Sequence, residues 1–267
     1  MKISTLNGLE RDSILIFNHV PKAGGTSLIN FFKELYGADK CYRHRGRNPS
    51  DDSYSPALET ISAEDREKLR FTAGHMAHGK HTLFPGRPYL YLGVVRDPID
   101  RIISDYYYNR TAGRPDLKEL TNKLSLSEYL KHKIDSGKSD LVRSSQILKV
   151  TGEKDLKKAK VVLEDEFFIC CTIKQLNRAQ SLMADFFGME TAPIRVNKSS
   201  KKPRTAESEL SKADIDTLKK ACKVDIQFVE MIDKMFEASA KKYAKTPVGE
   251  RDATIFKFDL LKAPIHT

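Results

Sequence analysis

A lysine, two glycines and two hydroxyl residues stand between an apolar run and a helix-like pattern near the start of the chain. The run Ile14–Val20 leads into PKAGGTS, whose anion-binding candidates are Lys22, Ala23, Gly24, Gly25, Thr26 and Ser27. The first N–H groups of a helix lack internal partners, and the helix dipole adds positive charge there, so a helix opening here would bind an anion. Glycine also lets the backbone approach a ligand closely. The pattern predicts a binding site for a phosphorylated nucleotide. The alternative is a strand–helix corner in which glycine and proline serve packing alone.

The order of these residues indicates which nucleotides the loop suits. The ATP and GTP loop reads G-x-x-x-x-G-K-[ST], with its lysine after the glycines. Here Lys22 precedes them, and no G-x-G-x-x-G follows the strand. The sequence therefore argues against an ATP-dependent phosphotransferase, which stays open as an alternative, and contains no dinucleotide fingerprint.

A second group of polar residues follows the apolar run Tyr89–Val95. Arg96 ends that run, and Ser104 lies eight residues further on, within a predicted helix. An arginine fork together with a hydroxyl makes a good phosphate clamp. The competing interpretation is an Arg96–Asp97 pair that ends the strand, followed by a helix whose tyrosines are buried.

Three histidines lie between these two groups, in FTAGHMAHGKHTLF. They are His75, His78 and His81, and imidazole is the side chain best suited to proton transfer near neutral pH. Their spacing could suggest a metal site, but zinc sites require firmer ligand geometry. We expect no metal here, and ordinary histidines of a surface loop remain the alternative.

The elements that must position these side chains alternate between strand and helix. Strands are predicted at 14–20, 71–74, 89–95 and 167–172, a long loop at 37–60, and helices at 25–36, 62–69, 98–108, 126–136, 140–150, 154–165, 176–187, 207–222 and 224–243. This pattern predicts an α/β fold of the P-loop-like three-layer α/β/α type, with a mostly parallel central sheet and additional C-terminal helices. Ligands bind at the carboxyl ends of such strands, so Lys22 and Arg96 should line one crevice.

Length and composition fit one soluble domain, 1–267. The 267 residues carry a net charge of +10, which favours anionic ligands. The basic residues are scattered, so we expect no nucleic acid as a partner. No apolar stretch approaches the ~18 residues of a membrane span, and the first residues lack the apolar core of a signal peptide, so we expect a cytoplasmic protein without a transmembrane segment. The four cysteines contain no C-x-x-C pair and are expected to be structural.

Taken together, the two groups resemble the two cofactor-binding segments of sulfotransferases. HVPKAGGTSL resembles their phosphosulfate-binding loop and VVRDPIDRIISDYYY their 3′-phosphate-binding segment. The resemblance is to the carbohydrate sulfotransferase type, including the heparan sulfate 2-O-sulfotransferase group and bacterial relatives, and it implies a core of the domain at about 12–240. The resemblance implies 3′-phosphoadenosine 5′-phosphosulfate (PAPS, product PAP) as cofactor. It also implies sulfuryl transfer to a hydroxylated acceptor, a glycan or glycolipid that could be anionic.

The resemblance also assigns roles to residues. The loop Lys22–Ser27 would hold the 5′-phosphosulfate, with Lys22 stabilising charge on the leaving group, and Arg96 and Ser104 would hold the 3′-phosphate. His75, which follows a glycine as the family's base does, would accept the acceptor proton, with His78 as second choice. The segments expected to close over the nucleotide and to contact the acceptor contribute Lys198, Ser199, Lys201 and Arg143. A nucleotide-binding module without catalysis is the non-enzymatic alternative.

Overall fold

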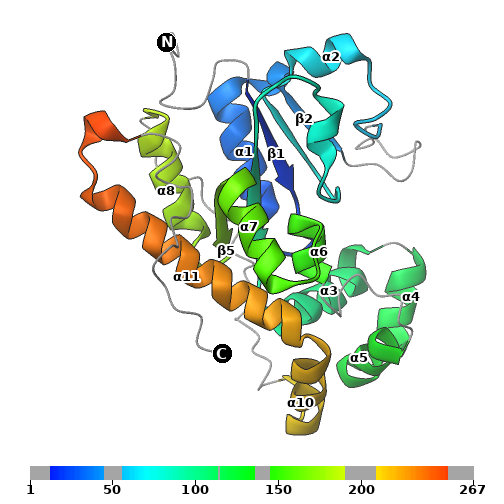
Figure 1. Cartoon of the computed structure of the whole chain (residues 1–267). Coiled ribbons are helices and arrows are strands. Elements are labelled where there is room, and N and C mark those ends of the chain that lie inside the picture. Colours follow the sequence, from blue (N-terminus) through cyan, green and yellow to red (C-terminus); the bar gives the residue numbers. More distant parts are fainter. Residues whose placement is uncertain (1–12, 45–55, 114, 136–144, 190–208, 252–267) are drawn as a thin grey trace.

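Five parallel strands form the centre of the molecule. The computed structural model describes residues 13–44, 56–113, 115–135, 145–189 and 209–251 (Figure 1). The strands lie in the order β2-β3-β1-β4-β5, and every pairing between them is parallel. Their bounds are β1 (Ile14–Asn18), β2 (Cys41–His44), β3 (Phe71–Gly74), β4 (Tyr89–Val95) and β5 (Phe167–Thr172). The predicted α/β fold with a parallel sheet is thereby confirmed.

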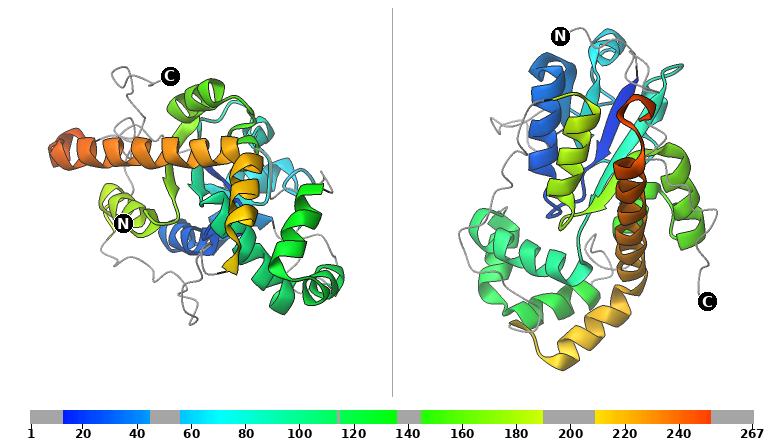
Figure 2. Two further views of the ribbon diagram at one scale, coloured as in Figure 1. Left: turned by 90° about the horizontal axis from the view of Figure 1, so that it is seen from below. Right: turned by 90° about the vertical axis from the view of Figure 1, so that its left-hand side faces the viewer.

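Helices cover both faces of this sheet. On one face lie α1 (Gly25–Tyr36) and α8 (Leu176–Phe186). The other face is covered by α6 (Ser145–Thr151) and α7 (Leu156–Glu166), and the long α11 (Lys223–Lys245) runs along the β5 edge of the sheet between the two helical layers (Figure 2). Because both faces are covered, the strands are almost continuously apolar, as buried parallel strands are. The predicted three layers are present.

A group of helices lies beyond the carboxyl ends of the strands. It comprises α3 (Pro98–Ala112), α4 (Pro115–Lys123), α5 (Leu126–Asp135) and α10 (Lys212–Ala221) (Figure 1). These helices share an apolar cluster of their own, separate from the main core, around Ile102, Tyr106, Tyr129 and Leu218. Since α3 continues directly from β4, this cluster fixes the direction in which the chain leaves the sheet after Arg96.

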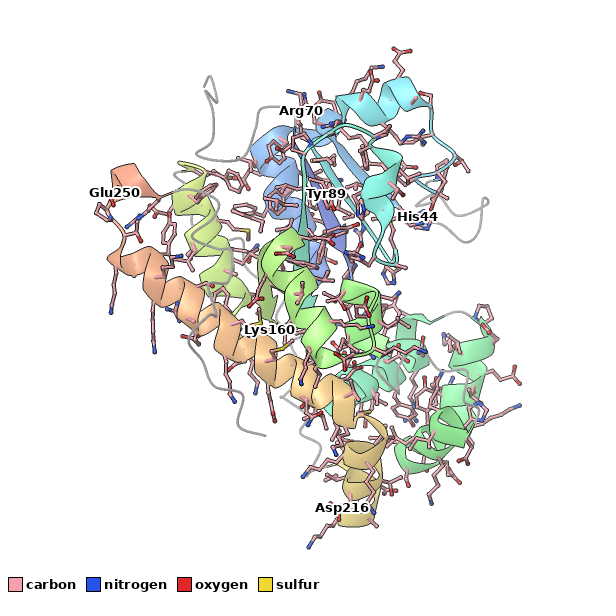
Figure 3. The ribbon with its side chains drawn as sticks, in the orientation of Figure 1. His44, Arg70, Tyr89, Lys160, Asp216 and Glu250 are labelled. Atoms are coloured by element: carbon pink, nitrogen blue, oxygen red, sulfur yellow. The ribbon has the colours of Figure 1, made fainter. Side chains whose placement is uncertain are left out.

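The main core fills the space on both sides of the sheet (Figure 3). Strands β1, β3 and β5 are buried along their whole length. A Cβ added at Gly93 would lie 2.4 Å from the Cys170 sulfur, so β4 carries a glycine where β5 presents a side chain. All four cysteines are free, and Cys170, Cys171 and Cys222 are buried, in agreement with a structural role.

Two elements differ from the sequence prediction. Strand β2 lies inside the segment predicted as a loop. It was not predicted because its residues are half-buried at the sheet edge and include Arg43 and His44, so no apolar run marks the strand. Helix α4 was also missed, being largely exposed. Helix α2 (Ala63–Lys68) begins as predicted, with the Ser62 hydroxyl accepting from the Asp65 N–H. The short η1 (Ala38–Lys40), η2 (Lys80–Leu83) and η3 (Val248–Glu250) complete the described chain.

None of the helices within the described ranges is both long enough and apolar enough to cross a bilayer.

Candidate active site

The loop between β1 and α1 has an unusual backbone. Lys22 has φ 66° and Gly24 φ 82°, both in the left-handed region, and Lys22 is the one non-glycine residue with positive φ among those described. The N–H of Ala23 donates to the carbonyl of Val20 at 3.2 Å, which closes the turn between them. For a side-chain-bearing residue this conformation costs about 1–2 kcal/mol. Such strain concentrates at functional sites, which supports a ligand-binding role for the loop.

Helix α1 begins without a side-chain cap. Its N-cap is Gly24, which offers no side-chain acceptor. Four other helices, α2, α3, α7 and α10, are capped by the side chains of Ser62, Asp97, Asp155 and Ser211. The first N–H groups of α1 therefore suit an anion, and the Thr26 side chain is exposed beside them. Ser27 is buried, and its carbonyl accepts from Gln180 at 3.2 Å, so it anchors the helix.

His19, which the sequence analysis did not select, connects this loop to His75. A Cβ added at Gly25 would lie only 2.2 Å from the His19 ring, so that ring requires glycine at the helix start. Burial, assisted by the nearby charges of His75 and then Arg43, lowers the pKa of His19 to about 3, so the ring is neutral. Its ring meets that of His75 edge-on, with centroids 4.8 Å apart.

His75 lies at the carboxyl edge of the sheet, as expected. It follows Gly74, the last residue of β3, which pairs with Asn18 at the end of β1. Its side chain is exposed, whereas His19 behind it is buried. An exposed imidazole beside the phosphate-binding loop is placed to exchange a proton with a bound substrate.

The Lys22 side chain extends toward α3. Its ammonium lies 3.6 Å from the centre of the Tyr108 ring, a cation–π contact. Burial lowers the pKa of Lys22, and Asp105 on α3 opposes that shift. Ser104 precedes Tyr108 by four residues and so shares its face of α3. The hydroxyl of Ser104 and the loop thus lie on the same side of the helix.

Arg96 connects the two predicted phosphate-binding segments directly. Its guanidinium Nη1 donates to the backbone carbonyl of Lys22 at 3.2 Å. Both backbone groups of Arg96 are held by the side chain of Gln146, which accepts from its N–H at 3.0 Å and donates to its carbonyl at 2.8 Å. Lys22 and Arg96 therefore lie in contact with each other at the carboxyl ends of β1 and β4.

The Arg96 anchor depends in turn on a buried carboxylate from α11. Asp225 is fully buried and accepts from the N–H of Gln146 at 3.0 Å and from the hydroxyl of Ser145 at 3.2 Å. Ser145 also accepts from the buried Arg101 at 2.5 Å. Asp225 acts as the N-terminal acceptor of α6, a role normally filled by a residue of the helix itself. No local pattern in the sequence indicates this contact, since the partners are 79 residues apart.

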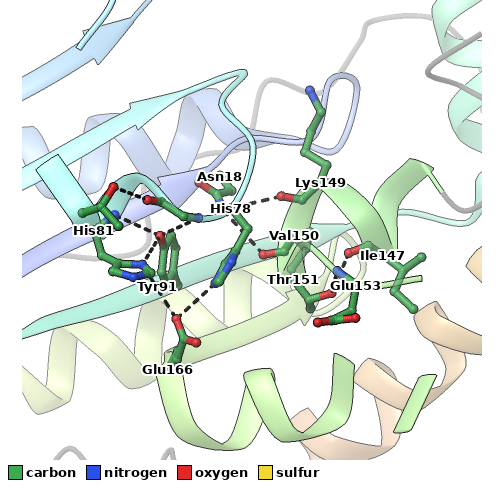
Figure 4. A network of polar contacts seen from close by, with 12 residues as sticks. Asn18, His78, His81, Tyr91, Ile147, Lys149, Val150, Thr151, Glu153 and Glu166 are labelled. Atoms are coloured by element: carbon green, nitrogen blue, oxygen red, sulfur yellow. Dashed lines mark hydrogen bonds and ion pairs between the residues drawn. The ribbon is translucent and has the colours of Figure 1, made fainter. Parts of the chain in front are cut away.

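The His78 side chain, the second candidate for the base, points toward Glu166 (Figure 4). Its Nε2 lies 3.1 Å from Glu166, the last residue of α7, and burial lowers the pKa of His78 while Glu166 opposes the shift. Nearby Tyr91, the third residue of β4, pairs with Phe167 at the beginning of β5. This places the His78 cluster over the amino half of β4, away from the end of the strand at Arg96. The structure therefore separates the two histidines considered as the base.

Lys198, Ser199, Lys201 and Arg143 lie outside the described residues, so their expected contacts with the nucleotide and the acceptor stay predictions.

Comparison with known proteins agrees with this geometry. A sequence profile described as the sulfotransferase family matches residues 9–150, which include Lys22, His75, Arg96 and Ser104. The chain belongs to the sulfotransferase family. It is therefore an enzyme that transfers sulfuryl groups, and the resemblance drawn from the two motifs is confirmed.

Among its relatives, the sulfotransferase is similar to enzymes named for heparan sulfate. It is 25% identical to human heparan sulfate 2-O-sulfotransferase 1 over 258 residues, covering 85% of this chain and 72% of the relative. The Xenopus laevis protein of that name is 26% identical over 75% of this chain and 63% of its own length. Heparin sulfate O-sulfotransferase of Drosophila melanogaster is 28% identical over 46% of this chain and 39% of its own length.

Proposed function

We propose that this sulfotransferase moves a sulfuryl group from PAPS to a hydroxyl of a carbohydrate acceptor, with His75 as the base. The observation that carries the proposal is the contact between Arg96 and the Lys22 carbonyl, with His75 adjoining the same loop. PAPS has two separate phosphate groups, at the 5′ and 3′ positions. Two linked phosphate-binding segments match that chemistry better than they match ATP, whose phosphates form a single chain.

The residues present fit the donor. The uncapped start of α1, with Gly24 in a left-handed conformation, suits the 5′-phosphosulfate, and Arg96 with Ser104 suits the 3′-phosphate. PAPS supplies the sulfuryl group and a phosphate leaving group. Lys22, whose backbone joins the two segments, supplies positive charge where negative charge develops as the bond to sulfur breaks.

His75 acts on the acceptor side. As the acceptor oxygen bonds to sulfur, its proton passes to a ring nitrogen of His75, and the bond between sulfur and the leaving phosphate oxygen breaks. His19 stays neutral behind it, so it adds no full charge of its own beside the proton acceptor. A histidine base of this kind contributes ~10²–10⁴-fold to the rate.

Charge near His75 supports an anionic acceptor. Arg43 and Lys149 are both close enough to lower the pKa of His19, whose ring touches His75. Together with the net charge of +10, these cations favour a glycan that carries carboxylate or sulfate groups. The names of the relatives, which refer to heparan sulfate, point to the same class of acceptor.

The donor assignment is tested by calorimetric titration with PAP, ATP and AMP. We expect tight binding of PAP and much weaker binding of the nucleotides that lack a 3′-phosphate. Equal affinity for ATP and PAP would contradict the proposal and favour the phosphotransferase alternative.

The acceptor assignment is tested with radiolabelled PAPS and a panel of desulfated heparan sulfate, a neutral polysaccharide and a glycolipid. Label is expected in the anionic glycan. PAP binding without label in any acceptor would favour the non-catalytic module.

A further inference from the structure

Two histidines and a glutamate meet on the sheet face beside Tyr91. His78 Nε2 lies 3.1 Å from Glu166 Oε2, and His81 Nδ1 lies 4.0 Å from the same oxygen. All three ligand atoms lie within 4.8 Å of one another. Their side chains are only 13–25% exposed. The cluster is therefore half-buried, with some access from solvent (Figure 4).

Two tyrosines hold the members of this cluster in place. The Tyr89 ring stacks on His81, with centroids 4.2 Å apart and planes 6° from parallel. The Tyr91 hydroxyl accepts the N–H groups of Gly79 at 3.1 Å and His81 at 3.2 Å. These contacts orient ligands before any ion binds, as outer partners do in metal sites.

Tyr91 also defines the tautomer of His81. The Tyr91 oxygen already accepts two N–H groups, so its own proton is free to be donated to His81 Nδ1, 3.0 Å away. His81 then carries its proton on Nε2. Its unprotonated Nδ1 accepts the Tyr91 hydroxyl while no ion is bound and lies 4.0 Å from the Glu166 carboxylate. Metals bind the unprotonated imidazole nitrogen, so this tautomer suits a metal on Nδ1, where the ion would replace the Tyr91 hydroxyl proton.

We propose that His78, His81 and Glu166 bind a divalent transition-metal ion, for which Zn²⁺ is the best match. Two imidazoles and a carboxylate are a ligand set that suits zinc and leaves a fourth tetrahedral position for water. At zinc–ligand distances of ~2.0–2.1 Å, ligand atoms in a tetrahedron lie roughly 3.4 Å apart. The pair at 3.1 Å lies close to this spacing, and the other pairs, which lie within 4.8 Å, would shorten when the ion binds.

Three histidines at a spacing of three define no ligand frame on their own, so the sequence predicts no metal here. Glu166, 88 residues after His78, supplies the missing ligand, while His75 lies apart at the strand end. A metal at this place would tie the segment that follows His75 to the junction of α7 and β5. The ion thus acts as a structural clamp on the loop that carries the proposed base.

The test is a titration of tag-free protein, dialysed against chelator, with ZnCl₂ in a calorimeter. We expect one equivalent per chain with micromolar or tighter affinity. His81→Ala and Glu166→Gln should each weaken binding at least tenfold, and the double variant should abolish it. His132→Ala, on the exposed part of α5, is the matched control and should bind as the original does.

Cobalt provides an independent measurement on the unaltered protein. Co²⁺ bound by these ligands should give the intense visible absorption of a tetrahedral site, displaced by one equivalent of Zn²⁺. Circular dichroism establishes that each variant is folded, and Glu166→Gln changes no volume. The proposal would be overturned by absence of stoichiometric binding, by weak octahedral absorption, or by undiminished binding in the double variant. His78, His81 and Glu166 would then be a hydrogen-bonded group without a metal. None of these readouts requires PAPS or sulfotransfer, so they are independent of the proposed function.

Discussion

Lys22 combines a strained backbone with a charge at the centre of the site. Glycine would adopt its φ of 66° freely, yet the position carries a long cationic side chain that rests on Tyr108. A lysine at this strained position is expected if its positive charge acts during the reaction.

Replacing Lys22 with alanine should therefore affect transfer more than binding. We expect the turnover number to fall ~10²–10³-fold, the loss typical of a group that stabilises developing charge, and PAP affinity to fall much less. Single-turnover assays with radiolabelled PAPS, beside PAP titration, measure the two effects. Lys22→Gly is the matched control: it should be equally inactive but more stable than Lys22→Ala by about 1 kcal/mol, because the strain is relieved. Equal losses in binding and transfer would remove the assigned role.

His75 should matter for turnover alone. Because its exposed ring packs on His19 and is assigned to the acceptor and not to the phosphate groups, His75→Ala should lower turnover ~10²–10⁴-fold and leave PAP affinity unchanged. The same assays on His44→Ala, at the end of β2, provide the control. Near-normal turnover of His75→Ala would return attention to His78.

At the scale of elements, α6 links the cofactor site to α11, a helix much later in the sequence. Its N-terminal N–H groups are satisfied by Asp225 of α11, and its Gln146 holds Arg96. The position of the arginine is thus determined by contacts between helices that are distant in sequence.

Asp225→Asn should weaken both stability and cofactor binding. Removing a buried charge that accepts several hydrogen bonds typically costs about 2–4 kcal/mol in the free energy of unfolding. PAP affinity should also decrease, because Gln146 no longer has a fixed helix start. Urea unfolding and PAP titration test both effects. Asp233→Asn, exposed on the same helix, should change neither; an unchanged free energy of unfolding for Asp225→Asn would show that the contact is dispensable.

The elements most readily predicted from the sequence were those with a strong local pattern. β4 and β5 are unbroken apolar runs, and α1 follows glycines and shows an apolar stripe. β2 could not be predicted because a half-buried edge strand of four residues resembles a polar loop. Its identity as a strand comes from pairing with β3, which is a tertiary contact.

The residues of the site likewise divide into those that the sequence predicts and those that it does not. Lys22 and Arg96 were predictable because each directly follows an apolar strand of a parallel sheet. His19 was not, since its importance lies in packing on Gly25 and touching His75. Glu166 and Asp225 act on residues about 80 positions away in sequence, and no local pattern indicates such partners.

For the molecule as a whole, His19 makes folding sensitive to acid. Its pKa is about 3 in the folded chain and 6.5 in the unfolded one, so the unfolded state binds the proton more readily. The stability contributed by neutral His19 is fully present above pH 6.5 and is lost as the pH falls toward 3.

Between pH 8 and pH 5, this residue should lower the free energy of unfolding by about 2 kcal/mol. The measurement is the difference between the original and His19→Gln in urea unfolding at each pH, which removes the contribution of other titrating groups. The variant should lose that part of the pH dependence. Parallel pH profiles for the two proteins would show that His19 ionises as easily in the fold as outside it.

The contact between Asp225 and α6 bears on how this enzyme can be divided. The segment that carries the family's signature, residues 9–150, includes every donor-binding residue discussed above except those outside the described ranges. It nevertheless excludes β5, which pairs along β4, and the carboxylate that completes α6. Excised alone, that segment would expose the apolar edge of β4 to pairing between chains. The catalytic signature and the cooperative folding unit are therefore different stretches of the chain, and fragments for screening or fusion should extend through α11.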